Sequence, residues 1–152
     1  MPIDDRDRLI LRHLQLDGRL TNADLAEKVA LSPSACLRRV RALEEGGYIK
    51  TYAAVLDEAV VGLPGVAFVL VTLDQQGRAA LDRFEGAVGR YPEILECYLL
   101  AGAADYLIRI AYADAADFER IHTAILTQLP GVVRLQSTLS LRKVKKTWAL
   151  PV

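Results

Sequence analysis

The stretch LSPSACLRRVRALEEGG, residues 31–47, predicts a helix with two chemically different sides. Ser32 followed by Pro33 predicts its start, because a serine hydroxyl accepts free first-turn amides and proline's fixed φ suits the first helical position. Gly46 and Gly47 predict its end, since glycine adopts a left-handed cap without a steric cost. At about 100° per residue, one side gathers the apolar residues Cys36, Leu37, Val40 and Leu43.

The other side of this helix is polar and basic. It gathers Ser34, Arg38, Arg41 and Glu45, with Ala35 and Arg39 flanking it. Residues 32–43 contain three arginines and no acidic residue, although the whole chain balances 19 Lys/Arg against 19 Asp/Glu. Small side chains at the N-terminal end permit close approach to DNA, and arginines one turn later reach guanine edges or phosphates. The alternative is a solvated surface helix, which the charge pattern alone does not exclude.

Two more helices precede this one. Asp4 can cap a helix over residues 4–16, with Asp7 at the third position, and Thr21 can cap a short helix over residues 22–30. A long helix followed by two helices joined by a tight turn is the helix-turn-helix arrangement, whose last helix lies in the DNA major groove. The alternating segment YIKTYAAVL, residues 48–56, then predicts a strand.

The remainder of the chain predicts a second domain. Buried or alternating runs predict strands over 65–73, 94–101, 105–113 and 132–144, and amphipathic patterns predict helices over 78–91 and 116–129. The order βαββαβ is that of an α+β ferredoxin-like sheet with both helices on one face. The expected domains are a winged helix-turn-helix DNA-binding domain (1–51), a linker strand and hinge (52–64), and a ferredoxin-like effector-binding and oligomerisation domain (65–152).

A candidate ligand loop lies in LLAGAADYLIRI, residues 99–110. Gly102 lets backbone amides approach an α-carboxylate, and Asp105 can pair with an α-ammonium group. A plain hairpin turn explains the same residues equally simply. By position, Ser137 and Thr138 on the last strand can add hydroxyls to this pocket, or can be ordinary strand residues.

Composition and motifs exclude several classes of protein. The chain has 152 residues, 52% of them hydrophobic, which suffices for a globular core. No run approaches the ~18 apolar residues of a membrane span, and the charged N-terminus is unlike a signal peptide, so we expect a cytoplasmic protein. Cys36 and Cys97 have neither disulfide nor zinc-site spacing. No cofactor, metal or catalytic motif is present, and His13 and His122 are interpreted as packing or surface residues.

Residues 31–57, together with DRLILRHLQLDGRLTNADLAEKVA at 7–30, closely resemble the Lrp/AsnC family of feast/famine transcription regulators. The resemblance extends over nearly the whole chain. It implies that the recognition helix meets DNA at Ser32, Ser34, Arg38, Arg39 and Arg41, with the small Ala35 beside them and Lys50 on a flanking phosphate. It also implies homodimers that assemble into tetramers or octamers.

The resemblance extends to the ligand loop, because the family carries Gly-x-x-Asp followed by an aromatic residue and Leu. Here these are Gly102, Asp105, Tyr106 and Leu107, and the family's loop lies between dimers and lines an amino-acid pocket. Ala103 and Ala104 depart from the family, in which a polar and an aromatic residue are common. The implied function is a DNA-binding transcriptional regulator that responds to an amino acid or related metabolite. The alternatives are a sirohaem-decarboxylase-like enzyme on a similar fold and a sensor without DNA binding.

Overall fold

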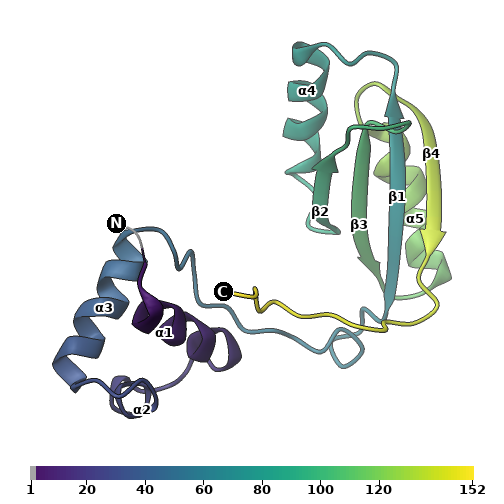
Figure 1. Cartoon of the computed structure of the whole chain (residues 1–152). Coiled ribbons are helices and arrows are strands. Elements are labelled where there is room, and N and C mark those ends of the chain that lie inside the picture. Colours follow the sequence, from purple (N-terminus) through teal and green to yellow (C-terminus); the bar gives the residue numbers. More distant parts are fainter. Residues whose placement is uncertain (1–2) are drawn as a thin grey trace. The chain divides into compact units, whose positions relative to one another are not determined.

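A computed structural model describes residues 3–152, which form two compact units (Figure 1). The first unit runs to Val55 and also contains the C-terminal segment Lys145–Val152, and the second spans Leu56–Val144. The first two residues of the expected 1–51 domain lie outside the described residues. The C-terminal segment, expected from the sequence to belong to the second domain, therefore lies in the first unit.

The first unit is built from three helices: α1 (Asp5–Leu16), α2 (Asn22–Lys28) and α3 (Pro33–Glu45). All three predicted N-caps are confirmed. Asp4 and Asp7 form a reciprocal capping box, the Thr21 side chain accepts the amide of Asp24, and Ser32 accepts the amide of Ala35. Each cap satisfies an amide that a helix start otherwise leaves unpaired, so the helices begin where the sequence predicts.

Apolar residues from all three helices form the core of the first unit. Ile10, Val29 and Cys36 are fully buried in it. The prediction that Leu37 belongs to the buried side of α3 is wrong, because its side chain is 39% exposed. Leu37 lies about 100° around the helix from Cys36, which turns it away from the core and toward the exposed side.

The predicted strand over residues 48–56 is also wrong, because this segment has no strand partner among the described residues. A strand requires a neighbouring backbone, which an alternating sequence cannot supply by itself. Tyr52 instead holds the segment against the helices: its ring approaches Gly18, and its hydroxyl donates to Glu44 Oε1 at 2.9 Å. Burial and the neighbouring Glu44 carboxylate raise the pKa of Tyr52 to about 12.

The second unit is a four-stranded antiparallel sheet in the order β2-β3-β1-β4, which confirms the ferredoxin-like topology. Its elements are β1 (Gly65–Leu73), α4 (Arg78–Val88), β2 (Ile94–Leu99), β3 (Tyr106–Tyr112), α5 (Ala115–Ala124), a 3₁₀ turn η1 (Leu126–Gln128) and β4 (Val132–Leu139). Alternate residues of β1 and β3 pack with Phe84 and Ile121 to form the core. No helix within residues 3–152 is long and apolar enough to cross a membrane.

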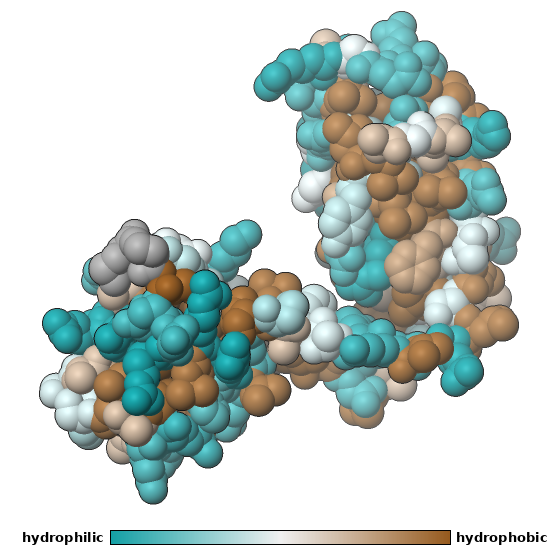
Figure 2. All heavy atoms as spheres, in the orientation of Figure 1, coloured by the Kyte–Doolittle hydropathy of each residue, from teal (hydrophilic) through white to brown (hydrophobic). Residues whose placement is uncertain are grey.

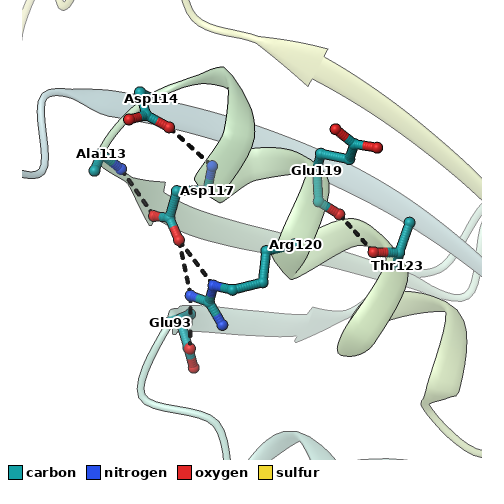
Figure 3. A network of polar contacts seen from close by, with 7 residues as sticks. All are labelled: Glu93, Ala113, Asp114, Asp117, Glu119, Arg120 and Thr123. Atoms are coloured by element: carbon teal, nitrogen blue, oxygen red, sulfur yellow. Dashed lines mark hydrogen bonds and ion pairs between the residues drawn. The ribbon is translucent and has the colours of Figure 1, made fainter.

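A polar network holds the N-terminus of α5 (Figure 3). Asp114 accepts the amide of Asp117, and the Asp117 carboxylate accepts the amide of Ala113 at 2.9 Å. Arg120 then joins Asp117 at 2.8 Å to Glu93 at 3.1 Å. The network thereby connects α5 to the segment just before β2.

The sheet face opposite the buried core carries a patch of apolar side chains, and brown spheres gather over this part of the second unit (Figure 2). Leu107 pairs with Leu70 on one side and Tyr98 on the other, so these three side chains form one row across the sheet. Phe68 in the next row is 40% exposed and Tyr98 is 53% exposed. The row of Phe68 also contains Arg109 and Glu96, which form an ion pair at 2.6 Å on this open face.

Candidate DNA-binding surface and effector site

The exposed side of α3 presents Ser34, Arg38 and Arg41, as predicted from the helical spacing. Among the described residues, Arg38 and Arg41 have neither a hydrogen bond nor an ion pair, so both guanidinium groups are available. Leu37 adjoins them on the same side, although the helical spacing predicts it on the buried side. On the helical wheel, Leu37 lies at the border between the apolar and the polar side. A leucine at such a border is buried only when a neighbouring element covers it, so this position is the sequence signal for its exposure.

Arg39 has a different environment from the other two arginines. Its Nη1 lies 2.8 Å from Asp7 Oδ1 and 2.8 Å from Asp4 Oδ2, both at the N-terminus of α1. The hydrogen bond to Asp7 is the main reason that the pKa of Arg39 is raised, and Asp4 adds to it. The pKa of Asp4 is lowered, chiefly by the backbone amide of Asp7 and then by Arg39. Arg39 therefore joins α3 to α1.

The N-terminal end of α3 is held by short polar contacts. Ser32 Oγ accepts the Ala35 amide at 3.3 Å and lies 3.3 Å from Ser34 Oγ. Asn22 of α2 donates its side-chain amide to the carbonyl oxygen of Pro33 at 2.8 Å. No local sequence signal indicates the Asn22 contact, because the two residues are eleven positions apart and only the turn between the helices brings them together.

Lys50 lies beyond the end of α3. Gly47 has φ +73°, which confirms a left-handed conformation at this helix end. Lys50 is exposed and has no partner in the part of the chain that the structure describes. Its ammonium group is thus free to approach an anion.

The candidate effector loop connects β2 to β3, with Gly102 and Ala103 exposed and Ala104 partly buried. Asp105 ends this loop and is tied to β1: its Oδ2 accepts the Leu73 amide at 2.7 Å, and its own amide donates to the Val71 carbonyl at 2.9 Å. One carboxylate oxygen therefore closes the end of the sheet. The other, Oδ1, takes no part in these bonds.

Tyr106, the aromatic residue after the loop, points into the core. It is 1% exposed, its ring centroid lies 4.5 Å from that of Phe84, and its hydroxyl donates to Glu85 Oε1 at 2.7 Å. Burial, followed by the Glu85 carboxylate, raises the pKa of Tyr106. This side chain supports the loop from beneath and is not exposed to a ligand in solution.

Ser137 and Thr138 are not brought beside the loop within one chain. Ser137 pairs with Val69 and lines an open pocket of about 340 Å³ with Phe118 and His122 of α5, whereas Thr138 pairs with Phe68 and is turned to the opposite face. Strand β1 lies between β4 and β3, so two strand spacings, roughly 10 Å, separate these hydroxyls from the loop.

The two histidines of the chain lie in different units. His13 is half-buried on α1 of the first unit, and His122 of the second unit packs 6.2 Å from the Phe118 ring centroid. Cys36 is buried and Cys97 half-buried, both as free thiols, and burial raises the pKa of Cys97 to about 11. Within residues 3–152, no cluster of His, Cys, Asp and Glu has the arrangement of a metal site.

Family models match both units. Residues 3–50 match a model described as winged helix-turn-helix DNA-binding, and residues 66–150 match the Lrp/AsnC ligand binding domain. Among curated relatives, the Bkd operon transcriptional regulator of Pseudomonas aeruginosa is 41% identical over 150 residues, covering 99% of this chain and 98% of that protein. The leucine-responsive regulatory protein of Escherichia coli is 36% identical over 145 residues, covering 95% and 88%.

Solved structures show the same likeness over nearly the full length. A transcriptional regulator from Neisseria meningitidis in complex with L-Met has a TM-score of 0.94 and 39% identity, covering 99% of this chain and 97% of that one. An AsnC family transcriptional regulator from Agrobacterium tumefaciens has a TM-score of 0.94 and 34% identity, covering 98% and 97%.

Proposed function

The chain belongs to the Lrp/AsnC family of DNA-binding transcriptional regulators, and from that premise we propose that α3 reads an operator sequence under the control of an amino acid. The observation that carries this proposal is the pair Arg38 and Arg41 on the exposed side of α3, neither of which has a partner among residues 3–152. Ser34 precedes them by one to two turns, so bases can approach the helix closely there.

The proposed DNA contacts divide by chemistry. Arg38 and Arg41 donate to base edges or phosphates, Leu37 contacts a thymine methyl group, and Lys50 neutralises a flanking phosphate. Ser32, Ser34 and Ala35 form the leading edge of the helix. Arg39 contributes only the donors that its carboxylate partners leave free, because its Nη1 is already bound.

The proposed effector is an amino acid bound at the loop between β2 and β3. The relatives support this class of ligand, since one is named leucine-responsive and another was solved with L-Met. Backbone amides around Gly102 would receive the carboxylate, and Asp105 Oδ1 the ammonium group. Ala103 and Ala104 leave room above the loop, and Tyr106 holds it from the core. Ser137 and Thr138 contribute only if another copy of the chain brings its β4 to this loop.

We propose a homodimer formed through the open face of the sheet, from which tetramers or octamers are assembled. The row of Leu70, Leu107 and Tyr98 is the kind of contiguous apolar patch that marks a protein interface. A second copy of the same face would cover it with matching side chains. Sedimentation of Leu107→Lys against the wild type tests this interface: the variant is expected to shift toward monomer.

DNA binding is tested with a duplex selected by the wild-type protein from a random pool and a shuffled duplex of equal composition. We expect Arg38→Ala to lose about tenfold or more of its preference for the selected duplex, as one bidentate base contact contributes ~1–3 kcal/mol. The matched control is Arg83→Ala, because Arg83 on α4 is exposed and has no partner among the described residues. Unchanged preference in Arg38→Ala and Arg41→Ala would contradict the proposed surface.

The effector is tested by thermal unfolding with each of the common amino acids. A ligand that binds only the folded chain at 100 times its Kd adds ~2.7 kcal/mol of apparent stability. We expect one or a few amino acids to raise the Tm of the wild type. If none does so at millimolar concentration, the amino-acid response is rejected and the DNA-binding proposal still stands.

A further inference from the structure

The C-terminal segment Lys145–Val152 lies against α1 of the DNA-binding unit. The side-chain amide of Gln15 pairs with the backbone of Leu150: Gln15 Nε2 donates to the Leu150 carbonyl at 3.2 Å, and Gln15 Oε1 accepts the Leu150 amide at 2.5 Å. One turn earlier on α1, Arg12 Nε donates to the Val152 carbonyl oxygen. A side chain that satisfies both backbone groups of one residue recognises an extended chain much as a neighbouring strand does.

The segment also packs and folds on itself. Val152 lies against the apolar core of the first unit, and its amide donates to the Leu150 carbonyl at 2.9 Å. The Ala149 amide donates to Thr147 Oγ1 at 3.1 Å, and Lys146 Nζ lies 4.8 Å from the Trp148 ring centroid. This segment is therefore a docked structural element, which we call the strap.

The residues between β4 and the strap are themselves fixed to the second unit by polar contacts. After β4, the Ser140 amide donates to the Val66 carbonyl at 2.9 Å, and Lys143 forms an ion pair with Glu58. Glu58 lies near the start of the second unit, inside a compact turn in which Asp57 accepts the Ala59 amide. The chain just before the strap is thus joined to the stretch by which the chain enters the second unit.

Helix α1 holds the recognition helix at one end and the strap at the other. Asp4 and Asp7 at its N-terminus bind Arg39 of α3, while Arg12 and Gln15 in its second half bind the strap. A displacement at the end of β4 can consequently reach α3 through the strap and α1, without passing through the linker. We propose that the strap, docked on Arg12 and Gln15, couples the effector domain to the DNA-binding unit.

The docking itself is tested by hydrogen exchange of the Leu150 amide in the full-length protein. We expect this amide to be protected in the wild type, and Gln15→Ala to speed its exchange by at least tenfold. Gln15→Ala changes no charge and introduces a good helix former, so α1 should fold normally. Gln76→Ala, in an exposed loop of the second unit, is the matched control and should leave Leu150 unchanged. An unprotected Leu150 amide in the wild type, or one that is indifferent to Gln15→Ala, overturns the docking.

The coupling rests on the proposed function and is tested by the ratio of operator Kd values with and without the amino acid that raises the Tm. We expect Gln15→Ala, and a chain lacking residues 145–152, to reduce this ratio at least threefold toward one. Their ligand-induced Tm shift should persist. An unchanged ratio in both variants overturns the coupling and leaves the proposed function intact. If no amino acid changes the operator Kd of the wild type, both the effector control and the coupling are rejected. The exchange rate of the Leu150 amide still tests the docking in that case.

Discussion

Arg39 Nη1 lies 2.8 Å from Asp7 Oδ1, and Asp7, at 3% exposed, is the one charged residue that is buried within residues 3–152. The other oxygen of Asp7 accepts the Asp4 amide at 3.1 Å, so the same carboxylate caps α1 and binds α3. An arginine on α3 thereby helps to orient that helix against α1. The three arginines of α3 are consequently expected to differ sharply when they are replaced one at a time.

Replacing Arg39 should destabilise the DNA-binding unit. Arg39→Ala leaves the buried Asp7 carboxylate without its cation, which costs about 1–3 kcal/mol. Thermal or urea unfolding measures this loss. Arg41→Ala should stay within about 0.5 kcal/mol of the wild type, because the Arg41 side chain is exposed and forms no ion pair within the described part of the chain. Equal stability of the two variants would show that the contact between α3 and α1 does not hold the fold.

Replacing Lys50 should weaken binding to every DNA sequence equally. Removal of one phosphate contact lowers the slope of log K against log salt by about one, because one fewer counterion is released. Titrations of the selected and shuffled duplexes between low and high salt measure this slope. A loss confined to the selected duplex would instead assign Lys50 to base recognition.

Two replacements of Asp105 should separate its structural role from its proposed ligand role. Asp105→Asn keeps an oxygen for the Leu73 amide and removes the charge, so the fold should persist while the amino-acid Tm shift is lost. Asp105→Ala leaves that amide without its partner and should lower stability by about 1–3 kcal/mol. Retention of the full Tm shift in Asp105→Asn would remove Asp105 from the effector site.

Two glycine-to-alanine changes should have opposite signs. At Gly65, opposite Tyr112 in the sheet, an added Cβ would lie 2.3 Å from the tyrosine ring, so Gly65→Ala should destabilise by about 1–3 kcal/mol. At Gly86, inside α4, nothing lies within 4 Å of the added carbon, and Gly86→Ala should stabilise by about 0.5–1 kcal/mol. Chemical denaturation of both variants gives the two signs, and two losses would contradict this packing.

Acid should weaken the network at the start of α5. The Ala113 amide, followed by Arg120, lowers the pKa of Asp117 below its ordinary value of 3.8. A depressed folded-state pKa contributes stability above about pH 4 that is lost as the pH falls through it. Asp117→Asn should therefore be less stable than the wild type at pH 6, and the difference should shrink toward pH 2. A difference independent of pH would mean that the charge of Asp117 contributes nothing.

The elements that local chemistry determines could be predicted from the sequence. The capped starts at Asp4, Thr21 and Ser32 and the strand β1 agree with the structure because each signal lies within a few residues of its effect. The exposure of Arg38 and Arg41 likewise follows from helical spacing alone. Such features need no knowledge of the tertiary arrangement.

The features that the sequence did not predict depend on contacts between distant residues. Arg39 meets Asp7 across 32 positions, and Gln15 meets Leu150 across 135. Residues 48–56 alternate like a strand but find no backbone partner within the described chain. Tyr106 follows the candidate effector loop in sequence, yet strand alternation turns it into the core. In each case the tertiary environment decides among options that the residue type leaves open.

The unequal environments of the three arginines also bear on how such a protein can acquire new DNA targets. Positions 37, 38 and 41 can vary with little consequence for folding, whereas position 39 is constrained by a carboxylate on another helix. A library that randomises the first three and preserves Arg39 should therefore retain folded members across most of its sequence space. We expect laboratory evolution toward new DNA targets to change residues 37, 38 and 41 and to retain Arg39.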